Sequence, residues 1–172
     1  MLERSFALVL GSKLKNRLLA ALPREPLSSI EPHLKNIPLR RGTVLCDANR
    51  PLSHVYFVEE GAVSLVTIFE DGATAEMATI GREGMIGVDT LLGSEQALGR
   101  YMVSLAGSAL AVETWRFRRA LRESPTLRAT CDIYAQSFFA HLLQNVACSA
   151  ECRLQRDPPG GAAVCTLAAD VR

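Results

Sequence analysis

The sequence feature that most constrains the fold is an Asp-Gly pair, Asp71-Gly72, which lies between two β-prone segments. The first segment, residues 62–69, is rich in Val, Leu, Ile and Phe, and the second spans residues 74–80. Both central residues of a type I′ turn have positive φ, which Asp and Gly adopt more readily than most residues. The pair therefore predicts a β-hairpin.

Glycines punctuate the neighbouring segments in a similar way. Residues 55–58 form an apolar run, and the Glu-Glu-Gly sequence at 59–61 predicts a turn before the hairpin. After the hairpin, the glycine-dense residues 81–87 and the segment 88–93 predict a tight loop that leads into a short helix. Further strand–turn–strand pairs are predicted at 37–40 with 43–46 and at 100–105 with 108–113. Short strands joined by glycine turns are typical of an antiparallel roll or barrel-like sandwich.

Helical spacing dominates both ends of the chain. Apolar residues three and four apart predict an amphipathic helix at 13–22, ended by Pro23, and a second helix at about 27–35. After a short basic helix at 116–123, a longer pattern begins at Pro125. Its steps of three and four define one helix face, at Leu127, Cys131, Tyr134, Phe138, Leu142 and Asn145. A pattern of this length predicts a helix that buries one face on the roll and another on a partner copy.

This arrangement resembles the cyclic-nucleotide-binding roll of the Crp/Fnr family of bacterial transcription regulators. The resemblance is carried by residues 54–61, the Asp71-Gly72 hairpin and residues 80–87, within a matching region of about 14–152. It implies an α+β, mainly β fold: an antiparallel β-roll or jelly roll with short N-terminal helices and a long C-terminal dimerisation helix. It also implies a cytoplasmic homodimer, joined through the helix at 126–152, that senses an effector and regulates transcription.

The predicted organisation has four parts: an N-terminal extension at 1–12, the roll at 13–124, the long helix at 125–154 and an irregular tail at 155–172. The tail contains Pro and Gly residues that stop a helix, where family members carry a helix-turn-helix. We therefore expect a truncated or frameshifted ending, so that DNA is bound only by a full-length relative. The alternative is a stand-alone ligand-binding or decoy subunit that pairs with full-length regulators through the same helix.

The resemblance also implies a candidate effector pocket, formed by Gly84, Ile86, Gly87, Val88, Asp89, Leu91, Arg100 and Tyr101. In members that bind cyclic AMP, a glutamate after the loop glycine holds the ribose. An arginine about ten residues later binds the phosphate beside a Ser or Thr. Here Val88 follows Gly87, and Tyr101 follows Arg100. Three alternatives remain open: cyclic AMP binding, a different effector in the same cavity, and a purely structural pocket.

Composition narrows the other function classes. The formal net charge of +1 provides no global basic field that would draw the chain to nucleic acid. Five cysteines without a secretory signal are typical of reduced thiols in the cytoplasm. The three histidines are scattered, so we predict no metal site, which counts against a metal-dependent cupin-like enzyme. Without a nucleotide-binding or hydrolase motif, we expect no enzyme, and no cofactor apart from a cyclic nucleotide or another small effector. No apolar run reaches membrane-spanning length.

Overall fold

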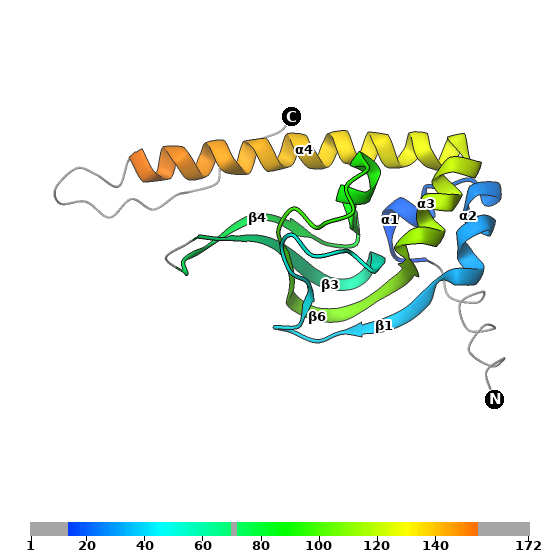
Figure 1. The fold of residues 1–172 in the computed structure, drawn as a ribbon, viewed down its shortest axis with the longest axis horizontal. Helices are drawn as coiled ribbons and strands as arrows, with labels where there is room; N and C mark the ends of the chain where they lie inside the picture. Colours follow the sequence, from blue (N-terminus) through cyan, green and yellow to red (C-terminus); the bar gives the residue numbers. More distant parts are fainter. Residues whose placement is uncertain (1–13, 70–71, 155–172) are drawn as a thin grey trace.

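The computed structural model describes residues 14–69 and 72–154, with side chains described as far as residue 145. The fold is an antiparallel β-roll flanked by helices, as expected from the sequence (Figure 1). Its strands are β1 (Lys35–Leu39), β2 (Val44–Cys46), β3 (His54–Ile68), β4 (Thr74–Ile80), β5 (Met85–Ile86) and β6 (Arg100–Glu113). Its helices are α1 (Arg17–Ala20), α2 (Arg24–Ile30), η2 (Glu31–His33), η3 (Val88–Leu92), α3 (Thr114–Glu123) and α4 (Pro125–Leu154).

The sheet is built around two long neighbouring strands, β3 and β6. The strand order is β1-β6-β3-β4, with β2 also paired to β6 and β5 also paired to β3, and every pairing is antiparallel. Inward-facing side chains of β3 and β6 form much of the core, including the fully buried Phe57 and Tyr101. The Phe57 ring meets Phe117 of α3 edge-on at 5.8 Å between ring centroids, which anchors the helical end of the molecule to the roll.

Two of the predicted turns are absent, because β3 and β6 each run through them without interruption. At the predicted 59–61 turn, β3 instead has register shifts between Val58 and Val63. The glycines there serve close contact between the strands. A Cβ on Gly61 would lie 2.4 Å from the Leu105 carbonyl oxygen, and one on Gly107 would lie 2.1 Å from the Glu60 carbonyl oxygen. These glycines therefore mark a bulged crossing of two long strands, which the sequence alone does not distinguish from turns.

The prediction of a strand–turn–strand pair at 37–46 was wrong in its pairing. β1 lies opposite residues 107–111 of β6, and Val44 of β2 lies opposite Met102 of the same strand. Between them, the Gly42 amide donates to the Val103 carbonyl at 2.8 Å. The chain therefore continues along β6 and does not fold back on itself, because β6 is long enough to pair with both segments.

The hairpin between β3 and β4 is confirmed. The two strands pair antiparallel from Val63↔Ile80 to Ile68↔Thr74, and the Phe69 amide donates to the Ala73 carbonyl at 2.8 Å. Gly72 has the expected positive φ of 83°. Asp71 lies outside the described residues, so the type I′ assignment stays a prediction.

The N-terminal helices are shorter than predicted. α1 covers four residues within the predicted 13–22, because the buried Asn16 caps it by accepting the Leu19 amide at 3.0 Å. The Asn16 amide group also donates to the Val58 and Gly84 carbonyls at 2.9 and 2.8 Å, which ties the helix to the roll. The second helix, predicted at 27–35, begins earlier, directly after Pro23, and gives way to β1 at Lys35.

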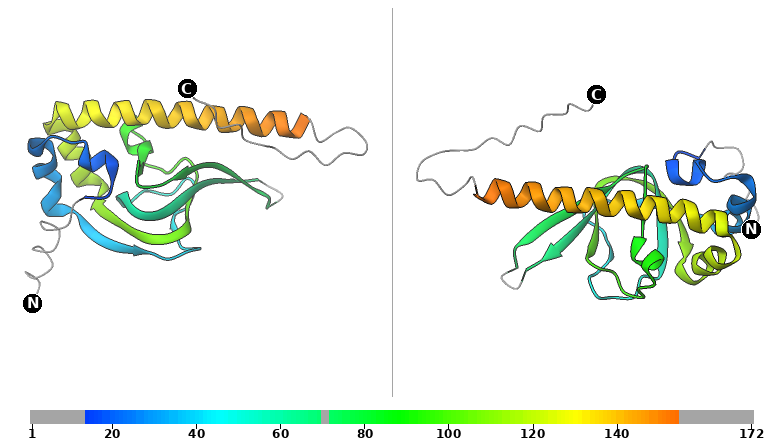
Figure 2. Two further views of the ribbon diagram at one scale, coloured as in Figure 1. Left: turned by 180° about the vertical axis from the view of Figure 1, so that it is seen from behind. Right: turned by 90° about the horizontal axis from the view of Figure 1, so that it is seen from above.

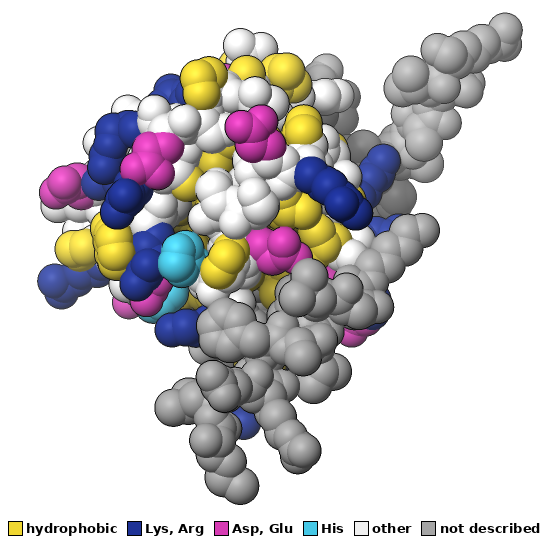
Figure 3. Space-filling view, turned by 90° about the vertical axis from the view of Figure 1, so that its right-hand side faces the viewer, with side chains coloured by type: hydrophobic (Ala, Val, Ile, Leu, Met, Phe, Trp, Pro, Cys, Tyr) yellow, Lys and Arg dark blue, Asp and Glu magenta, His cyan; other side chains and the backbone are white. Residues whose placement is uncertain are grey.

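The C-terminal helices agree well with the sequence. α3 begins two residues before the predicted 116–123, and α4 is one helix of 30 residues. α1, α2 and α3 gather at one end of the roll, and α4 lies along its side, over η3 and β4 (Figures 1 and 2). At the helical end, Lys and Arg side chains are interspersed with acidic and hydrophobic ones (Figure 3). Within the described residues, no helix is long and apolar enough to cross a membrane.

Candidate functional site

The loop from Gly81 to Leu92 belongs to the roll and contacts α4 in space. The predicted loop and short helix are confirmed, with η3 formed by Val88–Leu92. Gly87 precedes η3 with a φ of 103°, and a Cβ there would lie 2.6 Å from Leu52 Cδ2. Glycine at this position therefore serves both the backbone conformation and the packing. Of the candidate pocket residues, Ile86, Val88 and Leu91 are apolar and buried in the core.

Asp89 and Tyr101 form a buried polar pair inside the roll. The Tyr101 hydroxyl donates to Asp89 Oδ2 at 2.9 Å, while Asp89 Oδ1 has no hydrogen-bond partner among the described residues. Burial raises the pKa of Asp89, and the hydrogen bond from Tyr101 and the Leu98 backbone N–H partly oppose that rise. Burial, together with the charge of Asp89, also raises the pKa of Tyr101. The pair lies inside the roll, where the resemblance places an effector.

The residues assigned to ribose and phosphate do not form an anion site. Val88 is 1% exposed and carries no acceptor. Arg100 leaves the interior, and its Nε binds Asp47 Oδ1 at 2.6 Å, with both side chains more than a third accessible to solvent. In this arrangement Arg100 is paired with Asp47 and the Tyr101 hydroxyl with Asp89, so neither side chain is directed at a ligand inside the roll.

Gly84 and Tyr134 connect the loop to α4. The Tyr134 hydroxyl donates to the Met85 carbonyl at 3.2 Å and accepts from the Met85 amide at 3.1 Å. A Cβ on Gly84 would lie 2.3 Å from this hydroxyl, so only glycine leaves room for it. Burial raises the pKa of Tyr134, so the hydroxyl keeps its proton and remains a donor. The sequence analysis assigns Tyr134 to the long dimerisation helix, and in the structure its hydroxyl connects that helix to the loop within one chain.

The other residues of the predicted helix face also point toward the chain's own roll. Leu127 and Cys131 are 0% and 1% exposed, and Phe138 is buried beside them. Leu142 is half-buried against the same core, and Asn145 Nδ2 donates to the Met77 carbonyl of β4 at 3.2 Å. The predicted face exists and is the one buried on the roll, so a contact with a partner copy would need another face of α4.

A second series with the same spacing lies on the opposite side of α4. It consists of exposed residues at steps of four, three, four and three: Ala129, Ile133, Gln136, Ala140 and Leu143. Ile133 and Leu143 are 66% and 69% exposed, and they lie in one row along the helix. In the sequence, the spacing continues at Ala147, Ala150 and Leu154. Sequence reasoning missed this series, although its period of 3.5 residues was visible.

Two cavities lie on the two flanks of α4. One, of 740 Å³, is bounded by α1, the end of β4, Glu83 and α4, with Leu18, Tyr134 and Phe138 in its wall. The other, of 610 Å³, lies beside η3 and includes Leu92, Phe139 and Leu143. Neither lining includes a residue of the predicted effector pocket. Within the described part of the chain, no group of three or more His, Cys, Asp or Glu residues could hold a metal ion.

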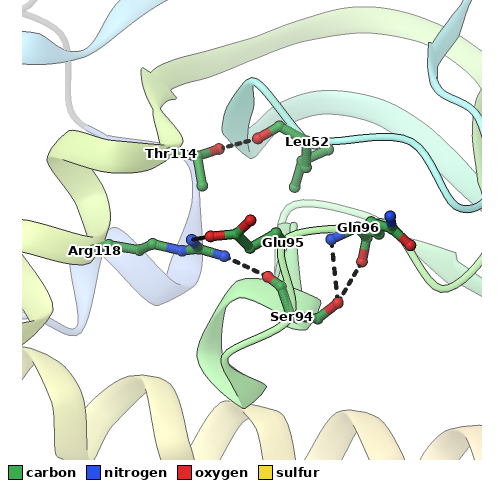
Figure 4. Close-up of polar contacts among 6 residues, drawn as sticks. All are labelled: Leu52, Ser94, Glu95, Gln96, Thr114 and Arg118. Carbon is green, nitrogen blue, oxygen red and sulfur yellow. Dashed lines mark hydrogen bonds and ion pairs between the residues drawn. The ribbon is translucent and has the colours of Figure 1, made fainter.

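A polar cluster holds the segment after η3 against α3 (Figure 4). Arg118 donates from Nη2 to the Ser94 carbonyl, and its Nη1 lies 3.5 Å from Glu95 Oε1. The Ser94 hydroxyl donates to the Gln96 carbonyl at 2.7 Å, which closes the turn. Thr114, at the start of α3, donates to the Leu52 carbonyl at 2.6 Å. α3 thus contacts both the segment before β3 and the segment after η3.

Comparison with known proteins identifies what this arrangement is similar to. A family model described as the cyclic nucleotide-binding domain matches residues 37–124. No curated protein matches the chain. Among solved structures, the c-di-GMP-responsive global regulator CLP from Xanthomonas campestris is 16% identical. Its TM-score is 0.63, over 79% of this chain and 66% of that chain.

Two further structures extend the likeness. The regulatory subunit of a cAMP-independent protein kinase A from Trypanosoma brucei is 13% identical, with a TM-score of 0.64, over 83% of this chain and 52% of that chain. The N-terminal domain of a transcriptional regulator from Streptomyces coelicolor A3(2) is 21% identical, with a TM-score of 0.52, over 86% and 99%. At these identities, the likeness concerns the fold: an antiparallel roll of the cyclic-nucleotide-binding type with a C-terminal helix.

Proposed function

Because the chain belongs to the cyclic nucleotide-binding domain family, we propose that it is the effector-sensing and dimerisation module of a Crp/Fnr-type transcription regulator. In this proposal it is a cytoplasmic homodimer and not an enzyme, and the described residues contain no helix-turn-helix. The regulators among its structural neighbours support this role at the level of the fold. The observation that carries the proposal is the outer face of α4, which we call the outer seam: Ala129, Ile133, Gln136, Ala140 and Leu143.

The outer seam has the pattern of a two-stranded coiled coil. Two small residues, Ala129 and Ala140, lie among larger ones along it, so that two helices could pack closely with Ile133 and Leu143 as the main apolar contacts. Gln136 is the polar member, of the kind that fixes register in such pairs. Because the other face of α4 is already buried on the roll, the helix contacts both the sensing loop and the partner.

Signalling would follow from this double contact. The Met85 hydrogen bonds of Tyr134 connect the loop to one face of α4, and the outer seam lies on the other. An effector that prefers one arrangement of the loop would then shift the population of two arrangements of the paired helices. In a full-length relative, the same shift would alter the spacing of two DNA-binding domains.

Analytical ultracentrifugation of the wild type and of Leu143→Glu tests the seam. In a symmetric dimer, the substitution would bring two unpaired carboxylates into an apolar contact. We expect dimer stability to fall by roughly 3 kcal/mol, more than a hundredfold in dissociation constant. Gln144→Glu is the matched control. Gln144 is the exposed neighbour of Leu143 and lies outside the seam, and its substitution adds the same charge. A monomeric wild type, or equal effects of the two variants, would contradict the proposed dimer.

A gel-shift experiment tests the remaining part of the proposal. The chain alone is expected to show no sequence-specific DNA retention, because its net charge is only +1 and the described residues contain no helix-turn-helix. Specific retention by these 172 residues would show that the module itself binds DNA.

A further inference from the structure

The 740 Å³ cavity between α1, β4 and α4, which we call the α1–α4 groove, has the size of a small-molecule site. Its floor is apolar and contains the buried side chains of Leu18, Ile80 and Phe138. The rings of Tyr134 and Phe138 lie side by side there, with 6.1 Å between their centroids and an angle of 36° between their planes. Figure 2 shows α1 lying beside α4 along this flank. The groove therefore offers an apolar, partly aromatic surface to a ring.

The polar groups around the groove fall into two sets. Its hydroxyls are already used within the chain: Thr130 and Ser137 donate to carbonyls four residues earlier in α4, and Tyr134 bonds to Met85. Arg17 and His141 differ, because the side chain of neither forms a hydrogen bond or ion pair with any described residue. Both are exposed. A guanidinium and an imidazole thus remain available as donors at the rim of an apolar floor.

Glu83 restricts what these donors can bind. Its carboxylate also lines the groove, where Oε1 accepts the Gly81 amide at 2.7 Å. One fixed negative charge near the cation disfavours a ligand with several negative charges, such as a phosphate ester, whereas a single carboxylate can still pair with Arg17.

We propose that the α1–α4 groove binds a small aromatic monocarboxylate. The ring lies on Tyr134 and Phe138, and the carboxylate accepts hydrogen bonds from Arg17 at the rim. This site is separate from the roll interior, where Asp89 and Tyr101 bond to each other. The inference deepens the proposed sensing function, because Ile133 borders the groove and also belongs to the outer seam. An occupant therefore contacts a residue that the dimer would use, while its binding does not require the dimer.

Phenylacetate is a suitable probe, titrated into the full chain and followed by saturation-transfer NMR and calorimetry. We expect a dissociation constant of about 1 mM, as is usual for a ligand of this size. Arg17→Gln should weaken binding about tenfold, because it removes a charge-assisted pair. The neutral analogue phenylacetamide should bind the wild type correspondingly less well.

Two alanines at the end of α1 provide a matched pair of variants. Ala21 lines the groove and Ala20, its exposed neighbour, does not. Ala21→Trp should fill the groove and abolish binding, whereas Ala20→Trp should bind as the wild type does. Failure of the wild type to bind phenylacetate, or unchanged binding by Ala21→Trp, would overturn the site. Leu143→Glu separates this inference from the proposed dimer. The side chain of residue 143 lies outside the groove, so the variant should bind phenylacetate as tightly as the wild type does.

Discussion

At the scale of single residues, Asp89 has the environment with the clearest consequence for stability. Its carboxyl is 1% exposed, accepts one hydrogen bond from Tyr101 and leaves Oδ1 without a partner among the described residues. Burial penalises the ionised form more than the neutral form, so the pKa in the folded chain lies above the ordinary value of 3.8. Between these two pKa values, the folded state holds one proton more than the unfolded state.

This difference predicts how stability responds to pH. Where the folded state holds the extra proton, raising the pH favours unfolding, and the loss is complete once the pH passes the folded pKa. Asp89→Asn cannot ionise. The free energy of unfolding of the variant, relative to the wild type, should therefore increase as the pH rises from about 4 and then level off. Urea unfolding at a series of pH values measures both curves.

Asp132→Asn is the control for this experiment. Asp132 lies on α4, is 43% exposed and pairs with Arg128 at 2.9 Å. Its removal should not reproduce the upward trend of Asp89→Asn, because an exposed pair of this kind contributes little to stability. Parallel curves for Asp89→Asn and the wild type would show that the buried carboxyl does not titrate as its surroundings indicate.

At the scale of elements, Arg118 is the main tie between α3 and the segment after η3. It contacts Ser94 and Glu95 in that segment, and the side chain is only 26% exposed (Figure 4). Arg118→Gln removes the charged donor that holds the segment. We expect amide hydrogen exchange at residues 94–98 to become about tenfold faster, with little change in the core strands.

Arg119 provides the matched control for this prediction. It lies next to Arg118 on α3 but points to solvent, where it pairs with Glu123 and is 66% exposed. Arg119→Gln should leave exchange at residues 94–98 unchanged, since surface pairs of this kind contribute little. Equal acceleration in the two variants would mean that α3 stability, and not the Arg118 contact, controls the segment.

The elements also show how far the sequence could be interpreted. The β3–β4 hairpin, η3 and α4 were predicted because each has a local signal: Asp-Gly, a glycine loop and a long helical period. The bulged crossing of β3 and β6 was not, because Gly61 and Gly107 look like turn residues until the partner strand is known. On α4, two faces carry the same spacing. Only the position of the roll shows that Leu127 is buried and Ile133 is exposed.

At the scale of the whole molecule, the candidate site illustrates the same limit. The sequence analysis assigned the effector pocket to the loop before η3, an assignment that stays a prediction, and it noted Val88 and Tyr101 as departures from the cyclic AMP pattern. It could not predict that Tyr101 would reach Asp89, twelve residues away, or that Arg100 would turn outward to Asp47. It also could not predict the α1–α4 groove, which forms only when a helix from each end of the chain meets β4.

The pairing of Tyr101 with Asp89 and of Arg100 with Asp47 leads to a prediction about ligands. Cyclic AMP or cyclic GMP at about 1 mM should leave the melting temperature unchanged and produce no binding heat. For a site with a dissociation constant of about 10 µM, this ligand concentration is about a hundred times the dissociation constant. Binding would then stabilise the folded chain by about 2.7 kcal/mol. For a domain of this size, that corresponds to a rise in melting temperature of roughly 5–10 °C. A flat melting temperature therefore excludes micromolar binding, and a rise of that size would show that Val88 and the outward Arg100 are compatible with a nucleotide site.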